Sequence, residues 1–127
     1  MEKLRSILLI DDDEVTNFLN QELMSDLQLA QQVETLTDAR QALELVEDRC
    51  SQGQGPDLIL LDLKMPVFSG FDFLSSFQKL PSSMVQHIKI IVLTTSNNPK
   101  DIQRLQDLGI ENVLNKPLTK EKILNLV

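Results

Sequence analysis

Apolar residues fall along the chain in two alternating patterns. Unbroken apolar runs, of which residues 7–10 and 58–61 are the clearest, are typical of strands that are buried on both faces of a parallel sheet. Between these runs, apolar residues return every three or four positions, which predicts amphipathic helices. Because strands alternate with helices, the pattern predicts an α/β fold with a doubly wound parallel sheet and helices on both of its faces.

The predicted elements follow from these patterns. Five strands are expected, over residues 7–10, 31–36, 58–61, 90–93 and 112–115. The second has only a weak apolar pattern and is expected at an edge of the sheet. Helices are expected over residues 14–27, 39–50, 71–78 and 99–108, followed by a short amphipathic segment that ends at Val127. Thr37 or Asp38 can cap the second helix, and Gly109 closes the fourth.

Apolar side chains at helical spacing define the first two helices. The first is amphipathic and carries Val15, Phe18, Leu19, Leu23 and Leu27. The inward face of the second is expected to carry Ala39, Ala42, Leu43, Val46 and Cys50. Because Cys50 is the only cysteine, it cannot form an internal disulfide, and its spacing predicts a small core residue.

Polar side chains stand where the predicted strands end. Those that could carry chemistry are Asp11, Asp12, Asp13, Asp62, Thr94 and Lys116. In a doubly wound sheet the carboxyl ends of the strands converge on one crevice, where ligands bind. Adjacent carboxylates repel one another by roughly several kcal/mol a pair at an effective dielectric near 20, so a cluster of them calls for a cation.

The residue types at these strand ends fit phosphoryl chemistry. Mg²⁺ takes one or two protein carboxylates, keeps several waters and bridges to phosphate oxygens. A carboxylate beside such a cation can attack phosphorus and form an aspartyl phosphate. Lys116 and Thr94 could supply the ammonium and hydroxyl that the remaining charge needs. Asp13 lies one step further into the loop and could simply start the next helix.

Length and charge narrow the function classes. The 127 residues are expected to form one domain, 1–127. Twelve Lys and Arg against 19 Asp and Glu give a net charge of −7, which argues against direct binding of nucleic acid or of anionic membranes. No apolar stretch is long enough to span a bilayer, so we expect a cytoplasmic protein without membrane insertion. The lone histidine, His87, is expected at the surface.

Four segments together resemble the receiver domain of bacterial two-component response regulators. They are "ILLIDDDEV", "PDLILLDLKMPVFSGFDFL", "IIVLTTS" and "NVLNKPLT", and the resemblance covers essentially the whole chain. It implies a flavodoxin-like sheet of order 2-1-3-4-5 and a stand-alone domain like the chemotaxis receivers. It also implies a phosphorylation-dependent signalling switch. Such a domain is not an enzyme, except that it catalyses its own phosphorylation and dephosphorylation.

The resemblance implies a role for each matching position at the acidic site. Asp62 resembles the aspartate that accepts the phosphoryl group. Asp11 and Asp12 resemble the acidic pair that holds Mg²⁺ together with Asp62, and the backbone carbonyl of Lys64 would complete the protein ligands. The phosphoryl group would come from a sensor histidine kinase or a histidine phosphotransfer protein. The output protein and any phosphorylation-linked homodimer are left open.

Switching in this family depends on further positions. Lys116 resembles the lysine that pairs with the phosphoryl group, joined to Pro117 by a cis peptide bond. Thr94 resembles the hydroxyl that moves toward the phosphoryl group and reshapes the segment after the fourth strand. Val113 departs from the family, which often has an aromatic residue at this position, so the aromatic part of the usual coupling is in question.

Two other functions compete with this interpretation. "LIDDDEV" also fits the signature of haloacid-dehalogenase-type phosphatases, with Asp11 as nucleophile and Asp13 as acid and base. That match leaves Asp62 without a role, and Glu121 is the only acid after Lys116 that could serve the further metal motif. The second alternative is a pseudo-receiver, an interaction module that is never phosphorylated.

Overall fold

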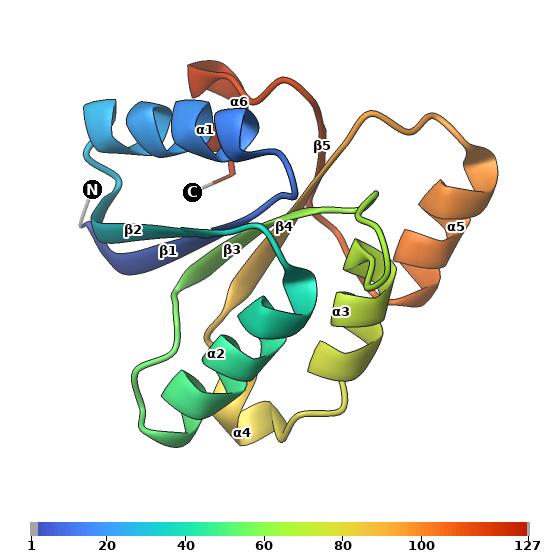
Figure 1. Cartoon of the computed structure of the whole chain (residues 1–127), viewed down its shortest axis with the longest axis horizontal. Helices are drawn as coiled ribbons and strands as arrows, with labels where there is room; N and C mark the ends of the chain where they lie inside the picture. The colour runs from blue at the N-terminus through green and yellow to red at the C-terminus, as the bar shows by residue number, and fades with distance from the viewer. Residues whose placement is uncertain (1–2, 127) are drawn as a thin grey trace.

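Five parallel strands form the centre of the structure, a computed structural model that describes residues 3–126 (Figure 1). They are β1 (Leu4–Ile10), β2 (Ala30–Leu36), β3 (Leu58–Asp62), β4 (Lys89–Thr94) and β5 (Val113–Asn115). Their order in the sheet is β2-β1-β3-β4-β5. The predicted fold class and strand order are confirmed, including the weak second strand at the edge. The predicted end of the last segment at Val127 lies outside the described residues.

Helices cover both faces of the sheet (Figure 1). They are α1 (Glu14–Asp26), α2 (Ala39–Ser51), α3 (Gly70–Phe77), α4 (Ser82–Val85), α5 (Pro99–Asp107) and α6 (Lys120–Leu124). Helices α1 and α6 lie on one face, and α2, α3 and α5 lie on the other. Asp38 caps α2, because its side chain accepts the backbone N–H groups of Arg40 and Gln41. The single turn of α4 was not predicted.

Among the described residues, no helix has the length and apolar content needed to cross a membrane.

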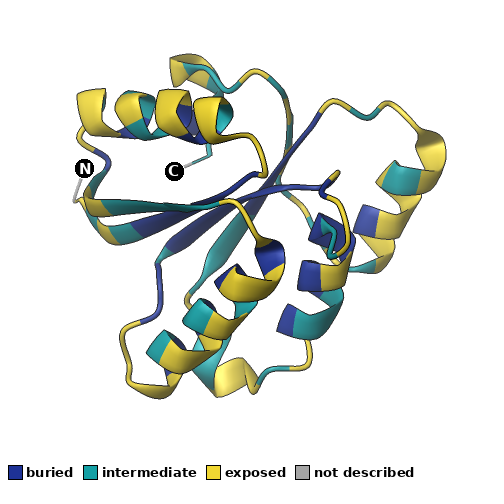
Figure 2. Ribbon diagram, in the orientation of Figure 1, coloured by how far each residue is buried: buried dark blue, intermediate teal, exposed yellow. Residues whose placement is uncertain are grey.

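The sheet is buried on both faces, as the unbroken apolar runs predicted. In β1, Leu8 and Ile10 join the core beneath α2 and α3, whereas Ile7 and Leu9 join the core beneath α1 and α6. Figure 2 shows the same result as a dark band through the central strands. Cys50 is buried in the first of these cores, as predicted, and burial raises the pKa of its thiol. The packed sheet therefore holds the strand ends in fixed positions.

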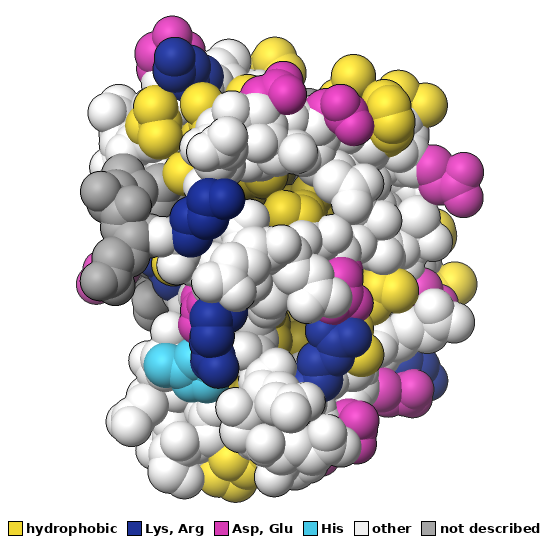
Figure 3. All heavy atoms as spheres, turned by 90° about the vertical axis from the view of Figure 1, so that its left-hand side faces the viewer, with side chains coloured by type: hydrophobic (Ala, Val, Ile, Leu, Met, Phe, Trp, Pro, Cys, Tyr) yellow, Lys and Arg dark blue, Asp and Glu magenta, His cyan; other side chains and the backbone are white. Residues whose placement is uncertain are grey.

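The molecular surface carries charges of both signs on the face drawn in Figure 3. Lys and Arg side chains lie among Asp and Glu side chains there. His87 is exposed, as predicted from the sequence.

Helix α1 is confirmed, but the first half of its apolar stripe faces outward. An amphipathic pattern normally turns its apolar residues toward the core. Here the large apolar side chains that α1 leaves exposed are Val15 at 65%, Phe18 at 57% and Leu19 at 61%. The side chains that it buries are Asn17, Asn20 and Met24. In this half of the helix, therefore, the polar side chains of Asn17 and Asn20 face the sheet instead of the apolar ones.

Backbone carbonyls at the ends of β1 and β2 explain the rotation of α1. Asn17 Nδ2 donates to the carbonyl oxygens of Asp11 at 2.9 Å and of Leu36 at 3.1 Å. One turn further on, Gln21 Nε2 donates to the carbonyl of Val33 at 3.0 Å. The carbonyl of Asp11 is buried, and a buried carbonyl without a partner is costly, so the amide of Asn17 faces the sheet. The apolar side chains between Asn17 and Gln21 are then carried to the surface.

The loop after β3 contains a strained residue. Val67 has a φ of +68° and is 98% exposed, and the N–H of Phe68 donates to the carbonyl of Pro66 across it at 2.7 Å. This is a γ-turn with positive φ at its centre, a conformation that is unfavourable for a β-branched side chain. The loop therefore stores strain five residues after Asp62.

We expect Val67→Asn to stabilise the protein by about 1 kcal/mol, because asparagine tolerates this region of backbone conformation and valine does not. Urea unfolding followed by circular dichroism would measure the change, since the chain lacks Trp and Tyr. Val67→Ala is the control, because it removes the branched side chain but keeps a residue that disfavours positive φ. A loss of stability in Val67→Asn would contradict the strain argument.

Candidate functional site

Three aspartates meet at the carboxyl end of the sheet. Asp11 directly follows β1 and Asp62 ends β3, and these two strands are paired neighbours. Asp12 is the next residue of the loop. One carboxylate oxygen from each of the three lies within 4.8 Å of the other two. Asp11 and Asp62 are buried, at 4% and 6% exposed, whereas Asp12 is exposed at the opening of the site.

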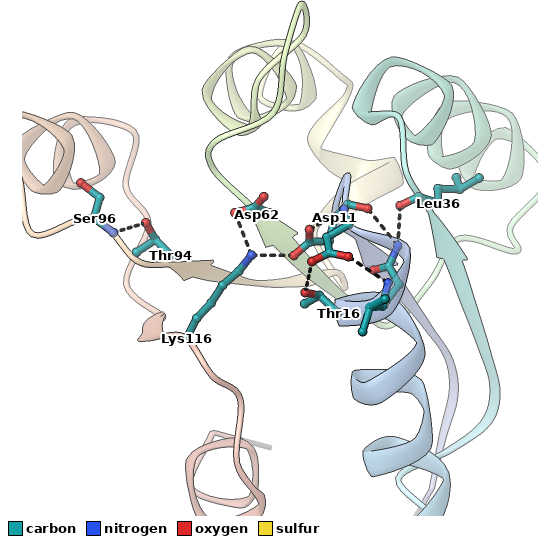
Figure 4. A network of polar contacts seen from close by, with 10 residues as sticks. Asp11, Thr16, Leu36, Asp62, Thr94, Ser96 and Lys116 are labelled. Atoms are coloured by element: carbon teal, nitrogen blue, oxygen red, sulfur yellow. Dashed lines mark hydrogen bonds and ion pairs between the residues drawn. The ribbon is translucent and has the colours of Figure 1, made fainter.

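Lys116 reaches into this acidic group from the end of β5. Its Nζ lies 2.7 Å from Asp11 Oδ2 and 3.3 Å from Asp62 Oδ1 (Figure 4). The backbone N–H of Lys116 also donates to the carbonyl of Thr94 at 3.0 Å, which fixes the lysine beside the end of β4. The peptide bond from Lys116 to Pro117 is cis, as the family resemblance implied.

The charges at the site act strongly on one another. Burial raises the pKa of the Asp62 carboxyl and the charge of Asp11 raises it further, and these outweigh the lowering by Lys116. Burial alone would lower the pKa of Lys116, but its hydrogen bond to Asp11 and the two carboxylate charges raise it overall. The ammonium of Lys116 is thus shared between the carboxylates of Asp11 and Asp62.

The three aspartates fit a hard divalent cation. Carboxylate oxygens are the donors that Mg²⁺ and Ca²⁺ prefer. Asp11 is held in place for such a role, because its Oδ1 accepts the backbone N–H of Asp13 at 2.9 Å. Because Asp12 is exposed, a cation bound there could keep some of its water ligands. The three aspartates could therefore hold a divalent cation such as Mg²⁺.

Asp13 does not join this group. It is the N-cap of α1, and its carboxylate accepts the N–H of Val15 at 2.9 Å and the hydroxyl of Thr16 at 3.0 Å. The hydroxyl and then the N–H lower the pKa of Asp13. The suggestion that Asp13 simply starts the helix is confirmed. An acid and base at this position, as a dehalogenase-type phosphatase would need, is not favoured.

Thr94 lies at the end of β4 and is only 3% exposed. Its Oγ1 accepts the backbone N–H of Ser96 at 2.9 Å (Figure 4). The hydroxyl serves as acceptor in this bond, so its own proton can still be donated. The predicted strand-end residues other than Asp13 thus lie together at the carboxyl end of the sheet.

A further side chain at this end of the sheet was missed. Asp101, in the first turn of α5, pairs with Lys64 Nζ at 3.1 Å and accepts the Ser96 hydroxyl at 2.6 Å. The hydroxyl and then the ammonium lower the pKa of Asp101. In the sequence, Asp101 lies two residues after Pro99, in the first turn of a predicted helix, where the helix dipole favours an acidic residue. No local signal links it to a lysine in a distant loop.

Comparison with known proteins identifies the relatives of the chain. Residues 7–127 match the family described as the response regulator receiver domain. The chain is 32% identical, over 97% of its length, to hybrid signal transduction histidine kinase B of Dictyostelium discoideum. It is 31% identical, over 95% of its length, to the probable methanogenesis regulatory protein FilR2 of Methanothrix harundinacea.

Coverage differs among these relatives. The chain spans 77% of FilR2 but only 6% of the hybrid kinase. Among solved structures, a two-component response regulator from Cytophaga hutchinsonii matches with a TM-score of 0.88 and 26% identity. That match covers 98% of this chain and 95% of the other. The likeness therefore extends over the whole fold described above.

Proposed function

The chain belongs to the family of response regulator receiver domains, the phosphoacceptor domains of two-component signalling systems, and we propose that Asp62 accepts the phosphoryl group. One observation carries this proposal: Asp62 is the carboxylate that ends a buried central strand within reach of both Asp11 and Lys116. The phosphoryl group is transferred as a bond forms from an Asp62 oxygen to phosphorus and the bond from phosphorus to the donor breaks. Like its relatives, the chain is a signalling protein.

The neighbours of Asp62 have separate tasks in this proposal. Asp11, Asp12, Asp62 and the backbone carbonyl of Lys64 hold Mg²⁺, which when bound neutralises charge on the carboxylates and on the phosphoryl oxygens. Lys116 already contacts Asp62 and moves onto a phosphoryl oxygen. The ammonium stays protonated there, because the surrounding carboxylates raise its pKa.

Thr94 provides the switch in this proposal. Its hydroxyl leaves the N–H of Ser96 and donates to the phosphoryl group, and the segment that leads to α5 follows. Val113, which stands where relatives often carry an aromatic residue, is 39% exposed on β5. Its short branched side chain offers no ring to follow the movement of Thr94.

The experiment that tests this function is mass spectrometry of the intact protein after incubation with acetyl phosphate. We expect a gain of one phosphoryl group that requires Mg²⁺ and is absent from Asp62→Asn. Asp13→Asn is the matched control, since it makes the same charge change beside the site in a residue that only caps α1. Donor hydrolysis that survives in Asp62→Asn but not in Asp11→Asn would instead support a phosphatase. No adduct on the folded wild-type protein would support a pseudo-receiver.

The donor in this proposal is a phosphohistidine on a sensor histidine kinase or a histidine phosphotransfer protein. The exposed apolar side chains of α1 support such a partner, because α1 starts directly after the acidic loop. A cavity of about 450 Å³ beside α1 is lined in part by Leu19, Leu23 and Leu118. Apolar side chains next to a reactive site favour docking of a protein over docking of a small polar donor.

We expect Phe18→Ser to slow phosphotransfer from a phosphorylated histidine phosphotransfer domain at least ten-fold, because large apolar anchors dominate interface energies. The experiment would use a histidine phosphotransfer domain that has been found to phosphorylate the wild-type chain. Phosphorylation by acetyl phosphate should be unchanged. Ile102→Ser is the control, since Ile102 is 46% exposed on α5. Equal effects of the two substitutions would contradict docking on α1.

A further inference from the structure

Asp101 joins the two loops that border the phosphorylation site. Lys64 lies two residues after Asp62, and Ser96 lies two residues after Thr94. Both side chains contact the same oxygen of Asp101, Oδ2, from the ends of β3 and β4. Asp101 itself belongs to α5, the helix that follows Thr94 in the chain. One carboxylate thus ties α5 to both sides of the site.

The geometry keeps the Lys64 ammonium on Asp101 and off Asp62. Lys64 lies close to Asp62 in the chain, yet among the described residues the ion pairs of Asp62 include Lys116 and not Lys64. The Lys64 side chain is 61% exposed, so it can turn without disturbing the core. The Asp101 side chain is only 15% exposed, so it is the fixed partner of the pair.

Phosphorylation changes the competition for this ammonium. A phosphoryl group on Asp62 adds close to two negative charges and three acceptor oxygens beside Lys64. We propose that Asp101 is a positioning residue that holds the Lys64 ammonium on α5 while Asp62 is unmodified and yields it to the phosphoryl group afterwards. This inference rests on the proposed phosphorylation of Asp62. It goes further, because it names a second connection from the site to α5.

This connection would act in parallel with Thr94. Transfer of Lys64 removes one of the two contacts that hold the first turn of α5 to the site, and the Ser96 contact remains. Because binding and conformational coupling are reciprocal, a protein without the Asp101 charge should bind the phosphoryl group more tightly. Val113 cannot supply an aromatic coupling, so an ionic route through Asp101 would carry part of the signal instead.

The test compares the affinity of each variant for beryllofluoride, a mimic of the phosphoryl group, in the presence of Mg²⁺. Calorimetry would measure binding, since the chain has no Trp or Tyr to report it. We expect Asp101→Asn to bind about two- to five-fold more tightly than wild type, the range that a partly exposed ion pair can supply. The amide oxygen of Asn still accepts the Ser96 hydroxyl, so this variant removes the charge alone.

Three controls decide between a coupling role and a structural one. Asp101→Glu keeps the charge and should restore the wild-type affinity. Asp107→Asn makes the same charge change at the other end of α5, and it should leave the affinity unchanged. In a Lys64→Gln background, Asp101→Asn should have no further effect. Tighter binding that persists in that background, or that also appears in Asp107→Asn, would overturn the proposal.

Amide hydrogen exchange of α5 gives an independent result. Beryllofluoride should speed exchange at residues 100–105 in the wild type, and Asp101→Asn should already exchange faster without it. Unchanged exchange in both cases would overturn the coupling. Asp62→Asn should not bind beryllofluoride. If the wild-type protein also fails to bind it, the proposed function is refuted, and this inference with it. Wild-type binding with no effect of Asp101→Asn would refute the inference alone.

Discussion

Lys116→Met is expected to lower the free energy of unfolding by about 3 kcal/mol at neutral pH and in the absence of divalent cations. The ammonium of Lys116 contacts Asp11 and Asp62, both of which are almost fully buried. Removal of one partner from a buried ion pair leaves an uncompensated charge, which typically costs about 3–5 kcal/mol. We take the lower end, because the Lys116 side chain is 20% exposed. Urea unfolding followed by circular dichroism would measure the loss.

The loss should shrink as the pH falls. The pKa of Asp62 in the folded protein already lies above its ordinary value, so the folded state binds this proton more tightly than the unfolded chain does. Without Lys116 that pKa rises further, because a group that lowers it is gone. Protonation of Asp62 then relieves the repulsion from Asp11. We therefore expect the difference in unfolding free energy between variant and wild type to be smaller at acidic pH than at neutral pH.

Mg²⁺ provides the second half of this test. In the wild type, Lys116 contacts carboxylate oxygens that the cation would need. The variant should therefore gain more stability from Mg²⁺ than the wild type does, as expected when a ligand binds only the folded state. The exposed Lys120→Met is the control for loss of one positive charge, and it should be neutral. A deficit in Lys116→Met that Mg²⁺ leaves untouched would argue against a cation at the acidic group.

The sheet could be predicted from the sequence because its strands are buried on both faces. Residues 7–10 and 58–61 contain no polar residue, which is typical of strands buried on both faces, and β1 and β3 are buried in this way. The face of α1 could not be predicted in the same way. Its rotation depends on which carbonyls Asn17 meets, and those belong to β1 and β2. Tertiary hydrogen bonds therefore outweighed the local apolar pattern.

The acidic group could be predicted because its members stand at strand ends, and topology alone brings strand ends together. Asp11 and Asp62 need only the pairing of β1 with β3 to become neighbours. Asp101 is different, since it reaches the site from a helix and its partner Lys64 comes from another loop. Such a pairing depends on how α5 packs against the sheet, which the pattern of apolar residues does not specify.

Gly70→Ala is the second substitution for which we expect a large effect, a loss of about 3 kcal/mol or more in the free energy of unfolding. Gly70 begins α3 and donates its N–H to the carbonyl of Leu63 at 3.0 Å. A Cβ at this position would overlap the backbone carbonyl oxygen of Asp62 and lie 2.8 Å from the Cα of Leu63. Both obstacles are backbone atoms, which cannot turn aside as a flexible side chain can.

The clash falls on the residue that is proposed to be phosphorylated. To admit a methyl group, either α3 must move away from the sheet or the end of β3 must shift. A shift of the end of β3 would carry Asp62 away from its place beside Asp11 and Lys116. We therefore expect Gly70→Ala to lose phosphorylation by acetyl phosphate along with stability. Both losses would be measured on the same preparation, by mass spectrometry and by urea unfolding.

Gly53→Ala separates this steric effect from the conformational cost of replacing a glycine. Gly53 has a φ of +72° and open space where its Cβ would stand, so its replacement should cost about 1 kcal/mol and leave phosphorylation intact. Gly70 has no positive φ, and its cost comes from contact alone. If Gly70→Ala cost no more than Gly53→Ala, the close approach of α3 to Asp62 would not be what positions the phosphorylation site.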